Sequence, residues 1–145
     1  MIMDRRQVLL VEDSPGDAFL VREAMSAVSA SSKLHVVGDG AEALEFLNGE
    51  GEYAGLPSPD LILLDLNLPI MDGKEALRRI KAHPQWKKIP VTILSTSDSE
   101  EDIASSYELS ANCYIVKPMD MQSFRDVVRA IDDFWFSVVR FPPKR

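Results

Sequence analysis

The sequence is poor in cysteine and histidine and has no long hydrophobic run. One cysteine, Cys113, among 145 residues excludes an intramolecular disulfide and a cysteine-rich zinc site, so we expect a reducing, cytoplasmic environment. No stretch approaches the ~18 consecutive apolar residues of a membrane span, and the amino terminus lacks a signal-peptide pattern. His35 and His83 have no spacing that suggests a metal site. These absences indicate a soluble protein without structural zinc.

Basic residues are also in the minority. There are 16 Lys and Arg against 23 Asp and Glu, a net charge of -7, which argues against nucleic acid or an anionic membrane as the partner. The length suits one cored domain, and no repeat or change of composition marks a second one. We expect a single domain over 1–145, with a core of about 6–139, a tail over 140–145 and no output domain.

Short apolar runs alternate with longer stretches in which apolar residues recur every three or four positions. Runs that are apolar on both faces are typical of strands in a covered parallel sheet. They span residues 7–11, 34–37, 60–64, 91–94 and 113–116. The helical stretches span 15–29, 41–47, 74–83, 100–109 and 121–139. This order predicts an α/β fold, a doubly wound five-stranded parallel sheet of the flavodoxin-like (βα)5 type.

Acidic residues follow two of these strands at their carboxyl ends, where open parallel sheets bind ligands. Glu12 and Asp13 follow the first strand, and Asp65 follows the third. Three neighbouring carboxylates repel one another unless a cation lies among them, and Mg²⁺ prefers oxygen ligands. We therefore predict a Mg²⁺ (or Mn²⁺) site of these carboxylates, with Glu12 acting through water and the backbone carbonyl of Asn67 completing the shell.

A positive charge and a hydroxyl group follow two other strands. Lys117 ends the fifth strand and Ser95 ends the fourth. A cation, an ammonium and a hydroxyl together can hold a phosphoryl group. A carboxylate placed between the metal and the lysine can attack such a group and form an aspartyl phosphate. The carboxylate is already ionised and needs no base, in agreement with the lack of a suitably placed histidine.

Five ordered motifs over nearly the whole chain resemble the response regulator receiver domains of two-component signalling, the family of the bacterial chemotaxis regulator. They are residues 9–13 (LLVED), 63–69 (LLDLNLP), 71–73 (MDG), 90–97 (PVTILSTS) and 114–118 (YIVKP). The resemblance implies that Asp65 is the phosphoacceptor and that Lys117 contacts the phosphoryl group. It assigns Glu12 and Asp13 to the metal.

The same resemblance implies a switch. Ser95 takes the position of the switch hydroxyl, with Thr96 as the alternative. Tyr114 takes the position of an aromatic residue that turns inward when this hydroxyl moves toward the phosphoryl group. The resemblance also implies a cis peptide bond between Lys117 and Pro118, which would aim the lysine at the site.

Two finer features concern phosphoryl lifetime and subfamily. Asn67 and Ser97 lie two residues beyond the acceptor and the switch hydroxyl, at positions that tune lifetime in this family. Residues 12–17 (EDSPGD), the 48–59 loop and a last helix prolonged through 134–136 (FWF) look like the stand-alone regulators paired with bacterial phytochrome kinases. The implied partner is a sensor histidine kinase of the bacterial phytochrome type.

Three phenylalanines are predicted on partner surfaces. Phe136 falls off the apolar stripe of the last helix on a helical wheel, and Phe141 lies nearby in the sequence. Phe19 lies opposite the apolar stripe of the first helix, which in this family helps to dock the kinase, so we expect it to contact the phosphodonor. We also expect a homodimer through the fourth helix, fifth strand and fifth helix.

Two other functions stay open on the sequence. A haloacid-dehalogenase-like aspartyl phosphatase also uses an aspartate, Mg²⁺ and a lysine, but it carries a second aspartate where this chain has Asn67. A degenerate receiver acting only as a binding module is disfavoured by the intact acidic residues and lysine. We expect a stand-alone response regulator that switches protein contacts in a phosphorelay. It would catalyse only its own phosphorylation and dephosphorylation, and so would not be an enzyme in the usual sense.

Overall fold

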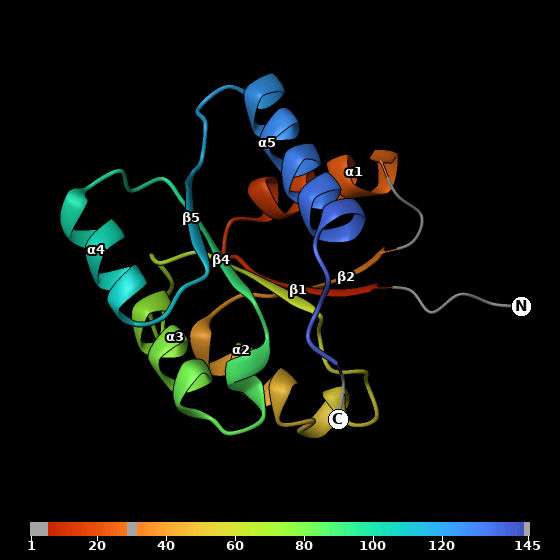
Figure 1. Ribbon diagram of the computed structural model, residues 1–145, viewed down its shortest axis with the longest axis vertical. Helices are drawn as coiled ribbons and strands as arrows, with labels where there is room; N and C mark the ends of the chain where they lie inside the picture. The colour runs from red at the N-terminus through yellow and green to blue at the C-terminus, as the bar shows by residue number, and fades with distance from the viewer. Residues whose placement is uncertain (1–5, 29–31, 144–145) are drawn as a thin grey trace, which may run out of the picture.

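A single parallel sheet runs through the molecule between two layers of helices (Figure 1). The computed structural model describes residues 6–28 and 32–143. The strands are β1 (Arg6–Val11), β2 (Ser32–Val37), β3 (Leu61–Leu64), β4 (Val91–Ser95) and β5 (Cys113–Val116). They pair in the order β2-β1-β3-β4-β5, and every pairing is parallel. The predicted doubly wound α/β fold is confirmed.

Five helices cover the two faces of this sheet. They are α1 (Pro15–Val28), α2 (Gly40–Leu47), α3 (Gly73–Ala82), α4 (Glu100–Glu108) and α5 (Met121–Asp133), with short 3-10 turns η1 (Gly51–Tyr53) and η2 (Trp86–Lys88). In Figure 1, α1 and α5 lie on one side of the sheet, and α2, α3 and α4 lie on the other. Each side has its own buried apolar cluster. No helix of the described ranges combines the length and apolar character of a membrane span.

Polar caps set where most helices begin. A side-chain oxygen before the helix accepts a hydrogen bond from a backbone N–H of the first turn, which would otherwise have no partner. The capping residues are Asp39 for α2, Asp72 for α3, Ser99 for α4 and Asp120 for α5. For α1, the Ser14 hydroxyl accepts from the N–H of Asp17 at 3.3 Å. The helices therefore begin close to the strand ends that carry the polar residues.

The last helix departs from the sequence prediction. Its α-helical part ends at Asp133 and continues as a π-helical turn, η3 (Phe134–Val138), rather than as an α-helix to residue 139. Side chains beyond Asp133 therefore do not follow an α-helical wheel, because a π turn holds more residues. Phe136 turns inward against Phe141, with ring centroids 5.7 Å apart, and both pack on the core. The predicted exposure of Phe136 is wrong, and Phe134 and Val138 are exposed instead.

The middle strand places the acceptor. All four residues of β3 are fully buried between β1 and β4, so the residue that follows, Asp65, lies at the centre of the carboxyl edge. Gly73 allows α3 to begin against it, since a Cβ atom there would lie 2.1 Å from the backbone oxygen of Asp65. Any larger residue at Gly73 would push the helix away from the site.

Candidate functional site

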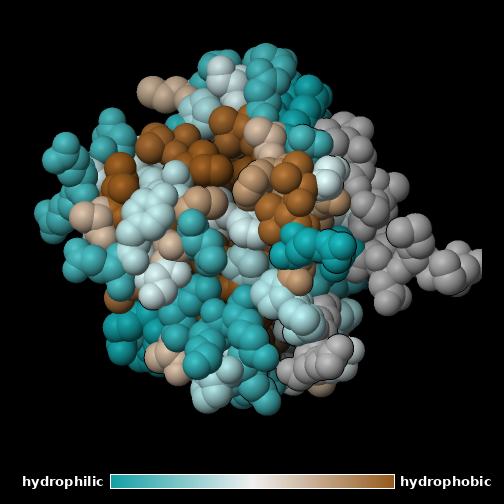
Figure 2. All heavy atoms as spheres, viewed as in Figure 1, coloured by the Kyte–Doolittle hydropathy of each residue, from teal (hydrophilic) through white to brown (hydrophobic). Residues whose placement is uncertain are grey.

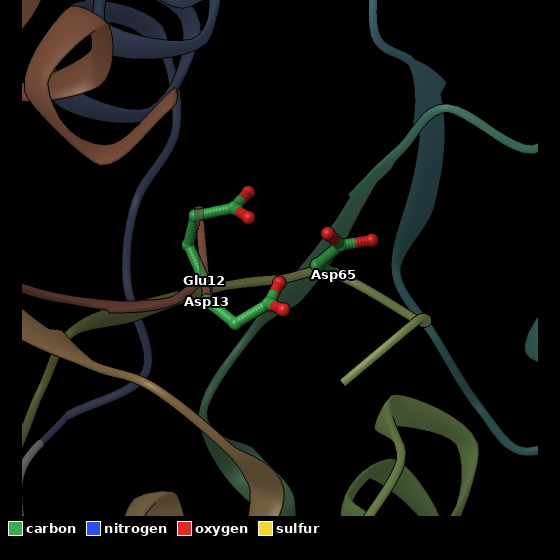
Figure 3. Close-up of side chains that lie close together, drawn as sticks. All are labelled: Glu12, Asp13 and Asp65. Carbon is green, nitrogen blue, oxygen red and sulfur yellow. The ribbon is translucent and has the colours of Figure 1, made fainter. Parts of the chain in front are cut away.

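Three carboxylates converge where β1 and β3 end (Figure 3). Glu12, Asp13 and Asp65 each offer one oxygen, and these oxygens lie within 4.8 Å of one another. Glu12 and Asp65 are buried, whereas Asp13 is exposed. This donor set fits a small divalent cation, which prefers oxygen ligands and keeps several waters on its open side. The structure thus brings together the three acidic residues predicted as metal ligands.

A buried lysine adjoins the carboxylates. The Lys117 side chain is 4% exposed, and its Nζ atom lies 2.5 Å from Glu12 Oε1, 2.9 Å from Asp17 Oδ2 and 3.2 Å from Asp65 Oδ2. An ammonium has three N–H donors, so these contacts use all of them. Burying such a charge is costly unless it is paired and hydrogen-bonded, which explains the cage of acids.

The three surrounding carboxylates keep the Lys117 side chain protonated. Burial lowers the pKa of Lys117, but the hydrogen bonds to Glu12 and Asp17 and the charge of Asp65 outweigh burial, so its pKa lies above the usual value. Lys117 is therefore a cation at neutral pH, in place to attract a phosphoryl group. Asp17 was not predicted at the site, because it comes from α1 and meets Lys117 only through the fold.

The two candidate switch residues differ in burial. Ser95 ends β4 and is fully buried, and its Oγ atom accepts a hydrogen bond from the N–H of Ser97 at 3.3 Å. Its carbonyl oxygen accepts from the N–H of Lys117 at 2.7 Å. Thr96 is exposed and lines a hollow of about 490 Å³ beside Asp17 and Lys117. Ser95 is thus linked to the lysine through its backbone carbonyl, whereas Thr96 lines the hollow beside the lysine.

The loop after β4 is tied to β5 and α4, and through α4 to α3. The Tyr114 hydroxyl on β5 donates to the carbonyl of Ser97 at 2.8 Å. The Ser97 hydroxyl donates to Asp102 on α4 at 2.5 Å, and the other oxygen of Asp102 pairs with Lys74 on α3 at 2.6 Å. Tyr114 is half-buried. Lys74 and Asp102 were not predicted, since nothing in the motifs distinguishes them from ordinary surface charges.

Two predicted features near the lysine and acceptor have different outcomes. The described residues contain no cis peptide bond, so the prediction of one between Lys117 and Pro118 is wrong. A trans bond is the lower-energy form, and Lys117 reaches the acids because β5 ends beside β4 and the ammonium has three anionic partners.

Asn67 is exposed and its N–H approaches Asp65 Oδ1 at 3.4 Å. Its role at the metal stays a prediction.

Sequence comparison agrees with this geometry. The family described as the response regulator receiver domain matches residues 8–129, from β1 into α5. The chain therefore belongs to the receivers of two-component response regulators, as its motifs indicated.

Proteins similar to this chain include a phytochrome response regulator. Response regulator Rcp1 of Synechocystis sp. is 44% identical over 135 residues, which cover 93% of this chain and 92% of Rcp1. The crystal structure of the phosphorylated cyanobacterial phytochrome response regulator RcpA superposes with a TM-score of 0.92 at 45% identity, covering 96% of this chain and 99% of RcpA. The Mn²⁺-bound form of Rcp1 gives a TM-score of 0.90 at 43% identity, covering 95% and 99%.

Proposed function

We propose that Asp65 accepts a phosphoryl group in a phosphorelay, with Mg²⁺ held by Glu12, Asp13, Asp65 and the backbone carbonyl of Asn67. The observation that carries this proposal is the meeting of three carboxylate oxygens within 4.8 Å beside the buried ammonium of Lys117. A bound divalent cation would neutralise the carboxylates and the phosphoryl oxygens. The Mn²⁺-bound Rcp1 and the phosphorylated RcpA support both parts of the proposal.

The residues would act in an in-line displacement. An oxygen of Asp65 attacks phosphorus, the bond from phosphorus to the donor nitrogen breaks, and the nitrogen leaves with the electron pair. Lys117 faces the phosphoryl oxygens and balances their charge. Asp65 is 7% exposed, so bulk water has limited access to it. The intact acids and lysine speak against a degenerate receiver that only binds partners.

The phosphodonor in this proposal is a sensor histidine kinase. The similarity to Rcp1 and RcpA favours a kinase of the phytochrome type. Phe19, on α1, is 62% exposed, as predicted, and Met119 and Met121 are exposed at the start of α5. Met119 and Met121 line the hollow in front of Lys117, and Phe19 lies on α1, the helix that also contributes Asp17 and Leu20 to it. We place the docking of the kinase on this surface.

The output in this proposal is a change of protein contacts, reported by Ser95, or alternatively Thr96, and by Tyr114. Apolar side chains gather over β5 and α5 in the face shown in Figure 2. Val116 on β5 and Phe134 in η3, which follows α5, are exposed apolar residues. We propose that a second copy of the chain binds through α4, β5 and α5. Steady turnover of small phosphate esters is not expected, because Asn67 cannot serve as the acid and base of a phosphatase.

The first test is the mass of the intact protein after incubation with acetyl phosphate and Mg²⁺. We expect one labile phosphoryl adduct in the parent and none in Asp65→Asn, because an amide is a poor nucleophile. Size-exclusion chromatography of the same samples reports whether the adduct changes the oligomeric state. An adduct of equal yield in Asp65→Asn would contradict the assignment, and no adduct in the parent would favour the binding module.

A further inference from the structure

One of the three acids around Lys117 stands apart from the metal cluster. Glu12 and Asp65 contact the lysine and also belong, with Asp13, to the group of oxygens that fits a divalent cation. Asp17 contacts the same ammonium at 2.9 Å but is not a member of that group. Among the described residues, it is therefore the one acidic partner of Lys117 that the proposed phosphotransfer leaves unengaged.

The other two contacts change during the proposed reaction. When an Asp65 oxygen bonds to phosphorus, the N–H that faced this carboxylate must turn to a phosphoryl oxygen. A bound cation would also draw on the negative charge of Glu12, which the lysine then no longer has to itself. The lysine stem is a flexible four-carbon chain and does not by itself hold the ammonium in one place. A third partner whose contact does not change during the reaction can hold the ammonium in place.

The structure gives Asp17 a fixed position for this role. It lies in the first turn of α1, where its backbone N–H donates to the Ser14 hydroxyl at 3.3 Å. Ser14 in turn donates its N–H to Glu12 Oε2 at 3.1 Å. The start of the helix is thus tied to the end of β1. The side chain of Asp17 is 33% exposed and that of Lys117 only 4%, so Asp17 closes the solvent side of the lysine.

We propose that Asp17 is a positioning residue, which holds the Lys117 ammonium toward the phosphoryl group while Glu12 and Asp65 engage the cation and phosphorus. This inference rests on the proposed function of Asp65. It assigns to α1 a part in the chemistry as well as in docking. Without Asp17, the ammonium loses its constant partner, and the N–H that faced Asp65 is no longer held toward the incoming oxygen.

The kinetic test compares two changes of Asp17 with a change elsewhere on α1. Asp17→Asn keeps the shape but removes the charge, and we expect phosphorylation by acetyl phosphate at saturating Mg²⁺ to slow about tenfold, the scale of one hydrogen bond between charged groups. Asp17→Glu restores the carboxylate and should recover part of the rate. The matched control is Glu23→Gln, which makes the same charge change at a residue that pairs with Arg125 on the surface. It should keep the parental rate.

A second measurement does not depend on activity. Nitrogen-15 NMR of the Lys117 ammonium, without metal or phosphodonor, should show a slowly exchanging signal in the parent and in Glu23→Gln. In Asp17→Asn the signal should exchange much faster, because one N–H loses its anionic partner. The same spectra show that each variant is folded.

The outcomes separate this inference from the proposed function. Phosphorylation of Asp17→Asn at the parental rate or faster, or an unchanged ammonium signal, would overturn the positioning role and leave Asp65 as acceptor. Absence of any adduct in the parent would overturn both proposals.

Discussion

Two buried charges in this chain have opposite surroundings. Lys117 is enclosed by three carboxylates, whereas Asp132 on α5 is 3% exposed and its Oδ1 atom has no hydrogen-bond partner within the described part of the chain. Burial, and to a lesser extent the charge of Asp133, raises the pKa of Asp132 above its ordinary value. The first charge serves the site, and the second lowers the stability of the fold.

We expect Asp132→Asn to stabilise the protein at pH 7 by about 1 kcal/mol, because an amide costs less to bury than a carboxylate. The carboxyl of Asp132 binds its proton more tightly in the folded protein than in the unfolded chain, whose pKa is about 3.8. The free-energy cost of burying the ionised carboxylate therefore disappears as the pH falls through the raised pKa of the folded state. Urea unfolding at several pH values between 4 and 7 should show the gain shrinking with acidity.

The matched control is Asp133→Asn, which changes the exposed neighbour and should alter stability little. A gain from Asp132→Asn of equal size at every pH would show that ionisation of Asp132 is not its cause.

At the scale of elements, the loop after β4 joins the site to the helices. Asp102 on α4 accepts from the Ser97 hydroxyl and pairs with Lys74 on α3. Tyr114 on β5 donates to the carbonyl of Ser97. For Ser95 to move toward a phosphoryl group, this loop must shift, and its ties to α3, α4 and β5 oppose the shift. We therefore expect these ties to favour the unphosphorylated arrangement.

We expect Asp102→Asn to increase the affinity for beryllofluoride, a phosphoryl mimic, by a few-fold in the presence of Mg²⁺. The amide weakens the ties to Ser97 and Lys74, so less free energy is needed to move the loop. Titration followed by NMR measures the affinity. Glu101→Gln changes an exposed acid beside Asp102 on the same helix and serves as the control. Equal affinity of the parent and Asp102→Asn for beryllofluoride would show that Asp102 does not hold the loop in place.

At the scale of the whole molecule, we propose different surfaces for input and output. Met119 and Met121 line the hollow beside Lys117, and Phe19 is exposed on α1, while Phe134 and Val138 are exposed in η3, beyond the end of α5. In the proposed function, a kinase approaches the surface around Met119, Met121 and Phe19 to bring its phosphohistidine to Asp65. The second surface stays free for another partner or a second copy.

We expect Phe19→Ala to slow phosphotransfer from the histidine kinase about tenfold, the effect of losing one aromatic interface contact. Phosphorylation by acetyl phosphate should stay at the parental rate, because a small donor needs no docking surface. Phe134→Ala removes an aromatic residue of similar exposure and should leave both rates unchanged. Equal kinase rates in Phe19→Ala and the parent would remove Phe19 from the docking surface.

The sequence alone determined the sheet, the five helices and the acidic core of the site. Buried parallel strands appear as uninterrupted apolar runs, and helix starts carry capping residues, so both are local signals. Glu12, Asp13 and Asp65 could be grouped because the carboxyl ends of parallel strands share one edge of the sheet.

Only the tertiary structure decided which side chains meet. The contact between Asp17 and Lys117 joins residues 100 positions apart, and the tie between Lys74 and Asp102 links two helices. The π turn after Asp133, which turns Phe136 inward, depends on packing against Phe141 that a helical wheel does not contain. Spacing along the chain carries the period of a strand or helix, but distances between side chains arise only when the elements pack.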